Sequence, residues 1–340
     1  MSETNPVEKI STMMKPAAAP VPASGRSGMD MAQIWDNFGM LIVFILLFAA
    51  CCFFIPNFAT WINMKGLGLA ISLVGTVACG MLFCLACGDL DLSVGSVVAC
   101  AGVVTAWVMN ATDSIFMGVA AGLLSGAFFG GINGFFIAIM KNNALIVTLA
   151  NMQIARGAAY TICGGIPIGI MNEHFYILGD SDLFGVPTPI LLTIACFIVF
   201  GLLLSNTVFG RNTLSIGGNE EAARLAGVNV VKTKILIFTM TGVIAAFAGI
   251  VLTSRLTSGQ PMNAMGLELS AISACVLGGV SLKGGVGRMP TVIAGVLILG
   301  TVENAMNLLN ISSFTQYIVR GLILLAAINL DQYKQKLRLS

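Results

Sequence analysis

Charged residues are scarce in this chain of 340 residues, because Asp, Glu, Lys and Arg together make up only 9% of it. A soluble domain carries about 25% of these residues. Hydrophobic residues reach 57%, so the chain has too little polar surface to face water. This excludes a soluble enzyme, a nucleic-acid-binding protein and a disordered scaffold. The formal charge of +2, from 17 basic and 15 acidic residues, gives no indication of an anionic partner.

Sequence signatures of catalysis and metal binding are also lacking. The chain has one histidine, His174, and no phosphate-binding loop, zinc-protease motif or nucleophile elbow. We therefore expect no ATPase, no metal site and no cofactor in the chain itself. Cys84 and Cys87 have the spacing of a metal or redox pair, but a hydrophobic span surrounds them. All nine cysteines lie in apolar runs and are predicted to be small buried hydrophobes.

Long apolar runs dominate what the chain does contain. Counting tilted or broken runs, ten approach the ~20 residues that a bilayer requires. We therefore predict an all-α polytopic membrane protein with about ten transmembrane helices, comprising a disordered cytoplasmic tail at 1–33 and a transmembrane domain at 34–340. The runs are 38–55, 67–88, 94–109, 115–140, 144–163, 190–205, 235–253, 268–281, 290–309 and 314–330.

The distribution of basic residues predicts that both chain ends are cytoplasmic. With that orientation, thirteen Lys and Arg lie inside and only Lys65 and Arg255 lie outside. Residues 164–189 then form an outer loop without Lys or Arg, and 206–234 form an inner loop with four of them. Glu173, Arg255 and Gln260 fall in outer connections, where a partner could meet them.

Ten spans can divide into two halves of five, and the second half then runs upside down relative to the first. Residues 151–157 (NMQIARG) resemble 315–321 (TQYIVRG), and each stretch lies in the last span of its half. Inverted repeats of this kind recur in transporters. Chance similarity among apolar helices is the competing explanation, and the sequence leaves both open.

Three ionisable residues lie inside predicted spans, where each costs about 2.5–3.5 kcal/mol at a helix centre. They are Arg156, Glu303 and Arg320. Glu303 and Arg320 are equidistant from a short turn, so an antiparallel hairpin brings them level and predicts an ion pair. Asn304 and Asn307 extend this polar stripe along the helix. A structural clamp is the favoured interpretation, ahead of direct contact with a substrate.

Two carboxylates, Asp89 and Asp91, occupy a glycine-bounded break between the second and third spans. Such a break can be a hinge, a site for a coupling cation or a helix cap. Asp91 and Ser93 can accept hydrogen bonds from the amides that open the third span, and capping is the favoured role. A cation site would instead indicate an ion-coupled secondary transporter, which stays open as an alternative.

Five glycines in the fourth span follow a stride of four residues. Small residues at this spacing give a helix a flat face on which another backbone can lie closely. We expect this face to serve helix packing, without information about a substrate. The glycines are Gly118, Gly122, Gly126, Gly130 and Gly134.

The inner loop contains a predicted short helix. Asn219 is a good N-cap, two acids suit the helix start, and Gly227 suits a left-handed stop. A helix of about two turns is marginal alone in water and needs a surface to pack on. Its small residues form a knob that suits a groove in another protein; they are Ala222, Ala223, Leu225 and Ala226. A helix that lies on the protein's own inner face is the alternative. The segment comprises Asn219, Glu220, Glu221, Ala222, Ala223, Arg224, Leu225, Ala226, Gly227 and Val228.

Several of these stretches resemble the ribose-type permeases of bacterial ATP-binding cassette (ABC) sugar importers. The resemblance covers about 35–340 and, at 63–72 and 300–312, extends most strongly to the L-arabinose importers. The motifs that carry it are 88–96 (GDLDLSVGS), 148–157 (TLANMQIARG), 210–228 and 277–288 (LGGVSLKGGVGR).

The resemblance implies a homodimeric subunit, surrounded by lipid in the bacterial inner membrane. It implies a cytoplasmic ATP-binding subunit, which uses ATP and Mg, and a periplasmic sugar-binding protein as partners. The family's coupling helix maps onto 219–228. The fold implied is the type II arrangement of vitamin B12 permeases. L-arabinose is the expected sugar, and ribose, xylose and galactose stay open.

Overall fold

The structure is a computed structural model and describes residues 31–339. It contains two units, Met1–Asp36 and Asn37–Ser340. Only the start of helix α2, from Met31, is described in the first unit. The expected tail at 1–33 therefore lies outside the described residues, apart from its last three. The second unit carries all the features below.

Each of the ten predicted apolar runs coincides with a helix. Leu, Ile, Val, Phe and Ala fill these helices, with turns and glycines between them. The ten are α2 (Met31–Phe54), α3 (Trp61–Ala86), α4 (Val94–Thr112), α5 (Ile115–Gly134), α6 (Ala144–Cys163), α8 (Thr188–Asn206), α11 (Val230–Leu256), α12 (Leu267–Leu277), α13 (Met289–Leu308) and α14 (Ser313–Leu339).

Shorter elements lie in the connections. A π-helix, η1 (Phe135–Ile139), continues α5, while α9 (Val208–Gly218) and α10 (Glu220–Leu225) lie in the loop before α11. The 164–189 loop holds β1 (Ile168–Gly169), η2 (Glu173–Tyr176), α7 (Ile177–Asp180), β2 (Asp182–Leu183) and β3 (Val186–Pro187). Strand β1 pairs antiparallel with β4 (Ser258–Gly259), and β2 pairs with β3.

Among the described residues, six helices are long and apolar enough to cross a membrane: α3, α4, α5 with η1, α8, α11 and α13. The apolar parts of α2, α12 and α14 are shorter, and α6 is not among the six. Helix α12 has 11 residues, or about 17 Å at 1.5 Å per residue, against a hydrocarbon core of about 30 Å. Length and apolarity therefore support six crossings, fewer than the ten expected.

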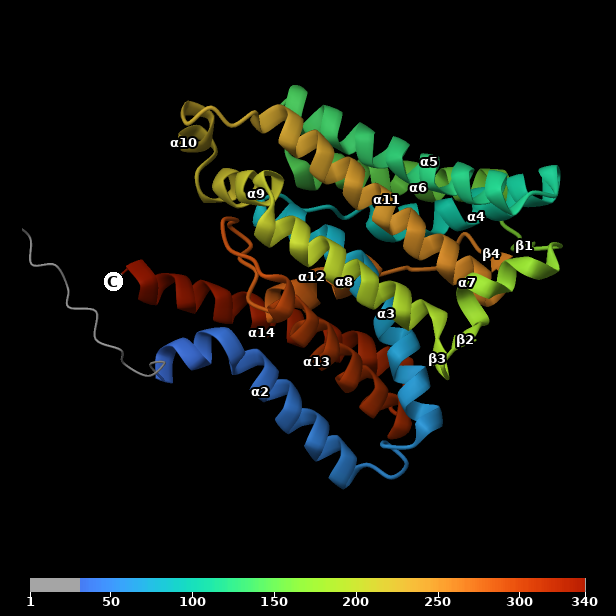
Figure 1. Cartoon of the computed structure of the whole chain (residues 1–340), viewed down its shortest axis with the longest axis horizontal. Coiled ribbons are helices and arrows are strands. Elements are labelled where there is room, and N and C mark those ends of the chain that lie inside the picture. Colours follow the sequence, from blue (N-terminus) through green and yellow to red (C-terminus); the bar gives the residue numbers. More distant parts are fainter. Residues whose placement is uncertain (1–30, 340) are drawn as a thin grey trace, which may run out of the picture. The chain divides into compact units, whose positions relative to one another are not determined.

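Helix α11 forms the centre of the second unit and packs against α3, α4 and α5. In Figure 1, α5 and α11 run side by side over most of their length. The glycine face of α5 makes this close approach: Gly126 lies against Gly242 and Ala246, and Gly130 against Phe238. Gly118 and Gly122 face α4 at Thr105, and Gly134 faces Ile235. A side chain at Gly126, Gly130 or Gly134 would have to displace backbone of α11.

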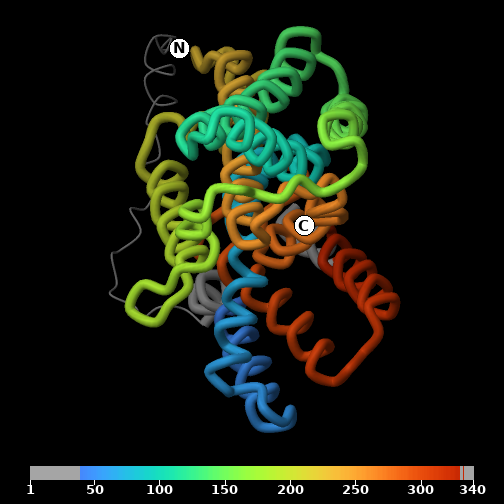
Figure 2. Tube along the Cα trace, turned by 90° about the vertical axis from the view of Figure 1, so that its right-hand side faces the viewer, coloured from blue at the N-terminus to red at the C-terminus, as the bar shows by residue number. Residues whose placement is uncertain are grey.

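The two protruding loops lie at opposite ends of the second unit. Helix α10 projects at one end, and α7 with the short strands lies at the other (Figure 1). Seen from that second end, the 164–189 loop, in yellow-green, crosses in front of the helix ends (Figure 2). This separation is consistent with one loop on each side of a membrane.

All nine cysteines are free, and six of them are buried. Cys84 and Cys87 lie at the buried end of α3, where Cys84 contacts the hydroxyl of Thr241 at 3.3 Å. Within residues 31–339, no three His, Cys, Asp or Glu side chains gather as metal ligands would.

The glycine face predicts a sharp difference between two neighbouring positions. A methyl group at Gly126 meets the carbonyl of Gly242 and the Ala246 side chain, whereas one at Gly131 has only Thr239 Oγ1 nearby, at 3.9 Å. Gly126→Ala should destabilise the protein by about 1–3 kcal/mol through overpacking. Gly131→Ala should leave it unchanged or slightly more stable. Thermal unfolding in detergent measures both, and equal midpoints for the two variants would contradict the packing.

Candidate functional site

Helix α10 begins and ends as the inner-loop sequence predicts. The Asn219 side chain accepts a hydrogen bond from the Ala222 amide at 2.9 Å, which satisfies a free donor of the first turn. Gly227 has φ of +87°, and its amide donates to the Arg224 carbonyl at 3.0 Å. The chain can therefore leave the helix after six residues and return towards α11.

The exposed face of α10 differs from the expected one at Ala223. This side chain is only 5% exposed and belongs to the hydrophobic core, so the expected knob of Ala222, Ala223, Leu225 and Ala226 is wrong at that position. One face of this six-residue helix packs on the core of the protein, and Ala223 lies on that face. Leu225 is 79% exposed, and Ala222 and Ala226 are exposed beside it.

Lys234, in the second turn of α11, ties α10 to the connection between α3 and α4. Its ammonium nitrogen lies 2.9 Å from Glu220 Oε2 and 3.0 Å from Asp89 Oδ2. The side chains of Lys234 and Asp89 are 12% and 16% exposed, whereas that of Glu220 is 57% exposed. Burial raises the pKa of Asp89, and the ammonium of Lys234 opposes that rise.

The second carboxylate of the break, Asp91, does not cap α4 as expected. Its Oδ1 atom accepts hydrogen bonds from the amide and hydroxyl of Ser93, at 2.9 and 2.6 Å. Ser93 is the N-cap of α4 but makes no side-chain capping bond. Burial raises the pKa of Asp91, and its hydrogen bonds from Ser93 and Asn133 oppose that rise. Asp91 therefore fixes the turn that precedes α4.

A chain of buried amides leads from Asp91 to α6. Asn133, on α5, donates to Asp91 Oδ1 at 3.3 Å and to Ser93 Oγ at 2.9 Å. Asn151, on α6, donates to Asn133 Oδ1 at 2.8 Å. Each of these groups would cost free energy if it were buried without a partner. The network therefore holds α5 and α6 in one register relative to the α3–α4 connection.

Arg156 lies further along α6 and binds the connection between α11 and α12. Its guanidinium donates to the carbonyls of Pro261 and Asn263, at 2.5 and 2.8 Å, and to Ser96 Oγ on α4 at 3.2 Å. The expected intramembrane polar cluster is thus divided, because the Arg156 guanidinium binds α4 and the α11–α12 connection, whereas Glu303 and Arg320 join α13 to α14.

The structure brings Glu303 of α13 and Arg320 of α14 together, with 2.7 Å between Oε1 and Nε. Their side chains are 19% and 35% exposed. Asn304 exchanges two hydrogen bonds with Asn63 of α3, at 2.9 and 2.8 Å. Asn307 accepts one from Gln316 at 2.8 Å. This polar stripe therefore binds α13 to both α3 and α14.

A glycine junction lies beneath α10, defined here as Gly88, Gly217, Gly284 and Gly285. The Gly285 amide donates to the Ala86 carbonyl at 2.9 Å. Gly217 lies against both Ala86 and Gly285, and Gly284 against Gly88. Gly88, Gly284 and Gly285 have φ of +87°, +86° and +75°, which L side chains rarely adopt. The end of α9 is thereby packed on the ends of α3 and the α12–α13 connection.

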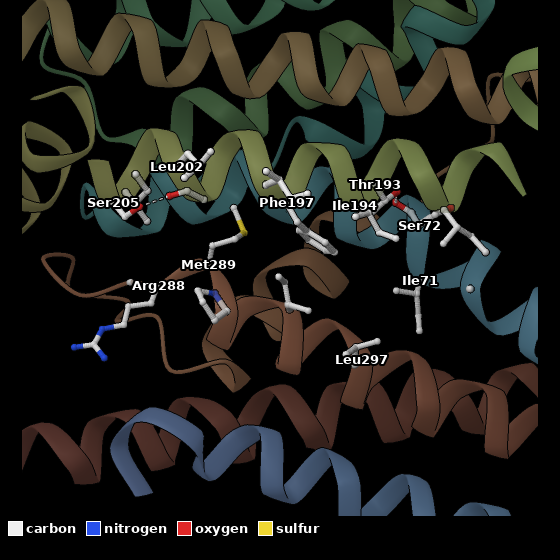
Figure 3. Close-up of a pocket in the computed structure, with 18 of the residues that line it drawn as sticks. Ile71, Ser72, Thr193, Ile194, Phe197, Leu202, Ser205, Arg288, Met289 and Leu297 are labelled. Atoms are coloured by element: carbon white, nitrogen blue, oxygen red, sulfur yellow. Dashed lines mark hydrogen bonds between the residues drawn. The ribbon is translucent and has the colours of Figure 1, made fainter. Parts of the chain in front are cut away.

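A cavity with a volume of about 900 Å³ lies between α3, α8 and α13. Isoleucines, leucines, Phe197 and Met289 line it, with Arg288 and Ser205 towards one end (Figure 3). The hydroxyls of Thr193 and Ser205 already donate to carbonyls of their own helix, at 2.9 and 2.8 Å. A sugar needs partners for its hydroxyls, so this lining does not suit one.

Residues 63–328 match the family described as branched-chain amino acid transport system / permease component. The chain belongs to this family of transport permeases. It is therefore a membrane permease and not an enzyme.

Several curated relatives extend the match beyond the family region. The L-arabinose transport system permease protein AraH of Escherichia coli strain K12 is 66% identical over 311 residues, covering 92% of this chain and 95% of the relative. The L-arabinose ABC transporter permease protein AraH of Azospirillum brasilense is 46% identical, covering 96% of each. The ribose import permease protein RbsC of Bacillus subtilis strain 168 is 37% identical, covering 82% and 87%. No solved structure matches the permease.

Sequence reasoning missed the partners that lie far away in the chain. Lys234 was counted only as an inner charge, and Asn63, Asn133 and Asn151 were not singled out as site residues. Glu268, at the start of α12, is a further ionisable residue among the helices, beside Gly95 of α4. A polar side chain within an otherwise apolar helix was the available signal for Asn133 and Asn151.

The contact between α13 and α14 predicts rescue by charge exchange. Glu303→Arg and Arg320→Glu should each destabilise the permease and so lower the yield of folded protein. The destabilisation should be smaller than the roughly 3–5 kcal/mol of a fully buried pair, because both groups are partly exposed. The double variant should recover most of that yield. Size-exclusion profiles in detergent compare the three variants, and a double variant worse than either single one would count against the pair.

Proposed function

We propose that this chain is the permease subunit of an ABC importer that carries L-arabinose across the bacterial inner membrane. The observation that carries the proposal is its 66% identity to the Escherichia coli L-arabinose permease over nearly the whole of both chains. Ribose is the second candidate sugar, because ribose permeases are 37–38% identical.

The proposed assembly contains two copies of this chain, ten spans in each copy, lipid around them and both chain ends in the cytoplasm. An inverted repeat of five and five spans, as in vitamin B12 permeases, is part of the proposal. Ten helices at the ten expected positions support it, as does the separation of α10 from the 164–189 loop. A periplasmic sugar-binding protein would meet the outer connections, which include Glu173, Arg255 and Gln260.

Helix α10 is the proposed coupling helix, and residues 219–228 dock into a cytoplasmic ATP-binding subunit. An exposed leucine on a single capped turn is a surface that water does not stabilise. ATP and Mg²⁺ belong to that partner, and no cofactor is assigned to the permease. The exposed pair of Glu221 and Arg224, 2.6 Å apart, would border the docking surface.

Movement of α10 would switch the permease between inward and outward access, because the ATP-binding subunits contact it differently in their open and closed states. The energy for import would come from the partner, and the permease would supply the path. The secondary-carrier alternative loses its main support, since Asp89 is paired with Lys234 and Asp91 with Ser93 and Asn133.

The proposal predicts that transport needs partners. Liposomes that contain the permease, its ATP-binding subunit and its sugar-binding protein should take up labelled L-arabinose only when ATP is present. Uptake by the permease alone, driven by an ion gradient, would overturn the importer assignment. Labelled ribose, xylose and galactose in the same liposomes determine the sugar.

The docking role of α10 has its own prediction. Leu225→Asp should leave the permease folded, because the side chain is 79% exposed, but should abolish co-purification of the ATP-binding subunit. Phe184→Asp is the matched control, since this residue is 96% exposed in the outer loop. It should retain the ATP-binding subunit. Equal retention by both variants would remove α10 from the interface.

A further inference from the structure

We propose that Lys234 is a positioning residue that transmits the movement of α10 to the α3–α4 connection and from there to α6. This inference rests on the proposed function, since it concerns how a docked ATP-binding subunit acts on the membrane helices. The ion contacts of Lys234 with Glu220 and Asp89 carry it.

Lys234 is the point where three elements meet. Its own backbone belongs to α11, Glu220 is the first residue of α10, and Asp89 lies in the α3–α4 connection. The ammonium is shared between two carboxylates at 2.9 and 3.0 Å. Attraction between such charges is stronger in a partly buried site than in water. A displacement of Glu220 therefore changes the force on a group that also holds Asp89.

The two contacts are unequal, and this gives the link two states. Water can replace the ammonium at Glu220, whose side chain is 57% exposed, far more easily than at Asp89, which is 16% exposed. When α10 moves, the contact to Glu220 is the one that breaks, and Lys234 then pairs with Asp89 alone. A coupling element needs two discrete arrangements of this kind.

Beyond Asp89, side-chain contacts and short stretches of backbone lead to the far part of α6. Asp91 lies two residues along the same connection and binds Asn133, which binds Asn151 of α6. Arg156, five residues further along α6, holds the carbonyls of Pro261 and Asn263. A shift of the α3–α4 connection would thus displace α6 where Arg156 contacts the α11–α12 segment.

Mere attachment of α10 does not require this charge. The glycine junction already packs the end of α9 on α3 and on the α12–α13 connection, and Ala223 anchors α10 in the core. Removing the ammonium should therefore leave the fold in place and change the response to ATP.

The first test replaces Lys234 in the complete transporter. Lys234→Met should lower ATP-driven L-arabinose uptake in liposomes by about 10-fold, while ATP hydrolysis and co-purification of the ATP-binding subunit persist. Lys234→Arg keeps the charge and should retain most uptake. Lys232→Met removes an exposed ammonium two residues away and should behave as wild type. Parallel loss of uptake, hydrolysis and assembly in Lys234→Met would reduce the residue to a structural role.

A double-variant cycle separates a serial link from independent contacts. Glu220→Gln interrupts the link at α10, and Asp89→Asn interrupts it at the connection. If both act through Lys234, the double variant loses no more uptake than the more affected single variant. If the loss of uptake in the double variant instead equals the product of the two single-variant losses, the proposal is overturned.

The same liposomes distinguish failure of this inference from failure of the proposed function. If wild type shows no ATP-dependent uptake, the importer assignment itself fails. If wild type transports L-arabinose but Lys234→Met matches Lys232→Met, only the role of Lys234 is wrong.

Discussion

The proposed transmission of movement from the projecting helix α10 to the membrane helices depends on the ammonium of Lys234, which contacts both Glu220 and Asp89. Polar groups that are buried away from water are stabilised by partners inside the protein. Here the partners are arranged in sequence, from Glu220 through Lys234 and Asp89 to the amides of α5 and α6. The contacts that give these polar groups their partners therefore also join elements that lie far apart in the chain.

Close backbone packing provides the rigid frame around this line of contacts. Gly126 and Gly130 of α5 lie directly against α11, and packed interiors resist continuous deformation. Movement is then expected as displacement of whole helices about their connections. At the glycine junction, backbones likewise meet with no side chain between them.

Local features were predictable from the sequence because their causes lie within a few residues. The apolar runs became helices, Asn219 caps α10, and Gly227 ends it with a positive φ. The contact of Glu303 with Arg320 was also predictable, since one short turn separates their helices. The apolar run at 268–281 did not reveal that the helix within it, α12, has only 11 residues.

Contacts between distant segments were not predictable. Asp89 and Lys234 are separated by more than one hundred residues, and each alone looks like an ordinary residue at a membrane surface. The burial of Ala223 depends on which face of a single turn meets the core, which periodicity cannot determine over six residues. The same limitation hid the pairing of Asn63 with Asn304.

Accessibility of α6 in the working transporter tests the central claim most directly. Thr161 is exposed near the end of α6 that adjoins the 164–189 loop, so Thr161→Cys can be labelled with a membrane-impermeant maleimide after Cys52, Cys163 and Cys196 are replaced by Ser. The account predicts that trapping the ATP-binding subunits in their closed state changes the labelling rate when Lys234 is present. It also predicts that this change is lost in Lys234→Met. An equal change in both proteins would contradict transmission through Lys234.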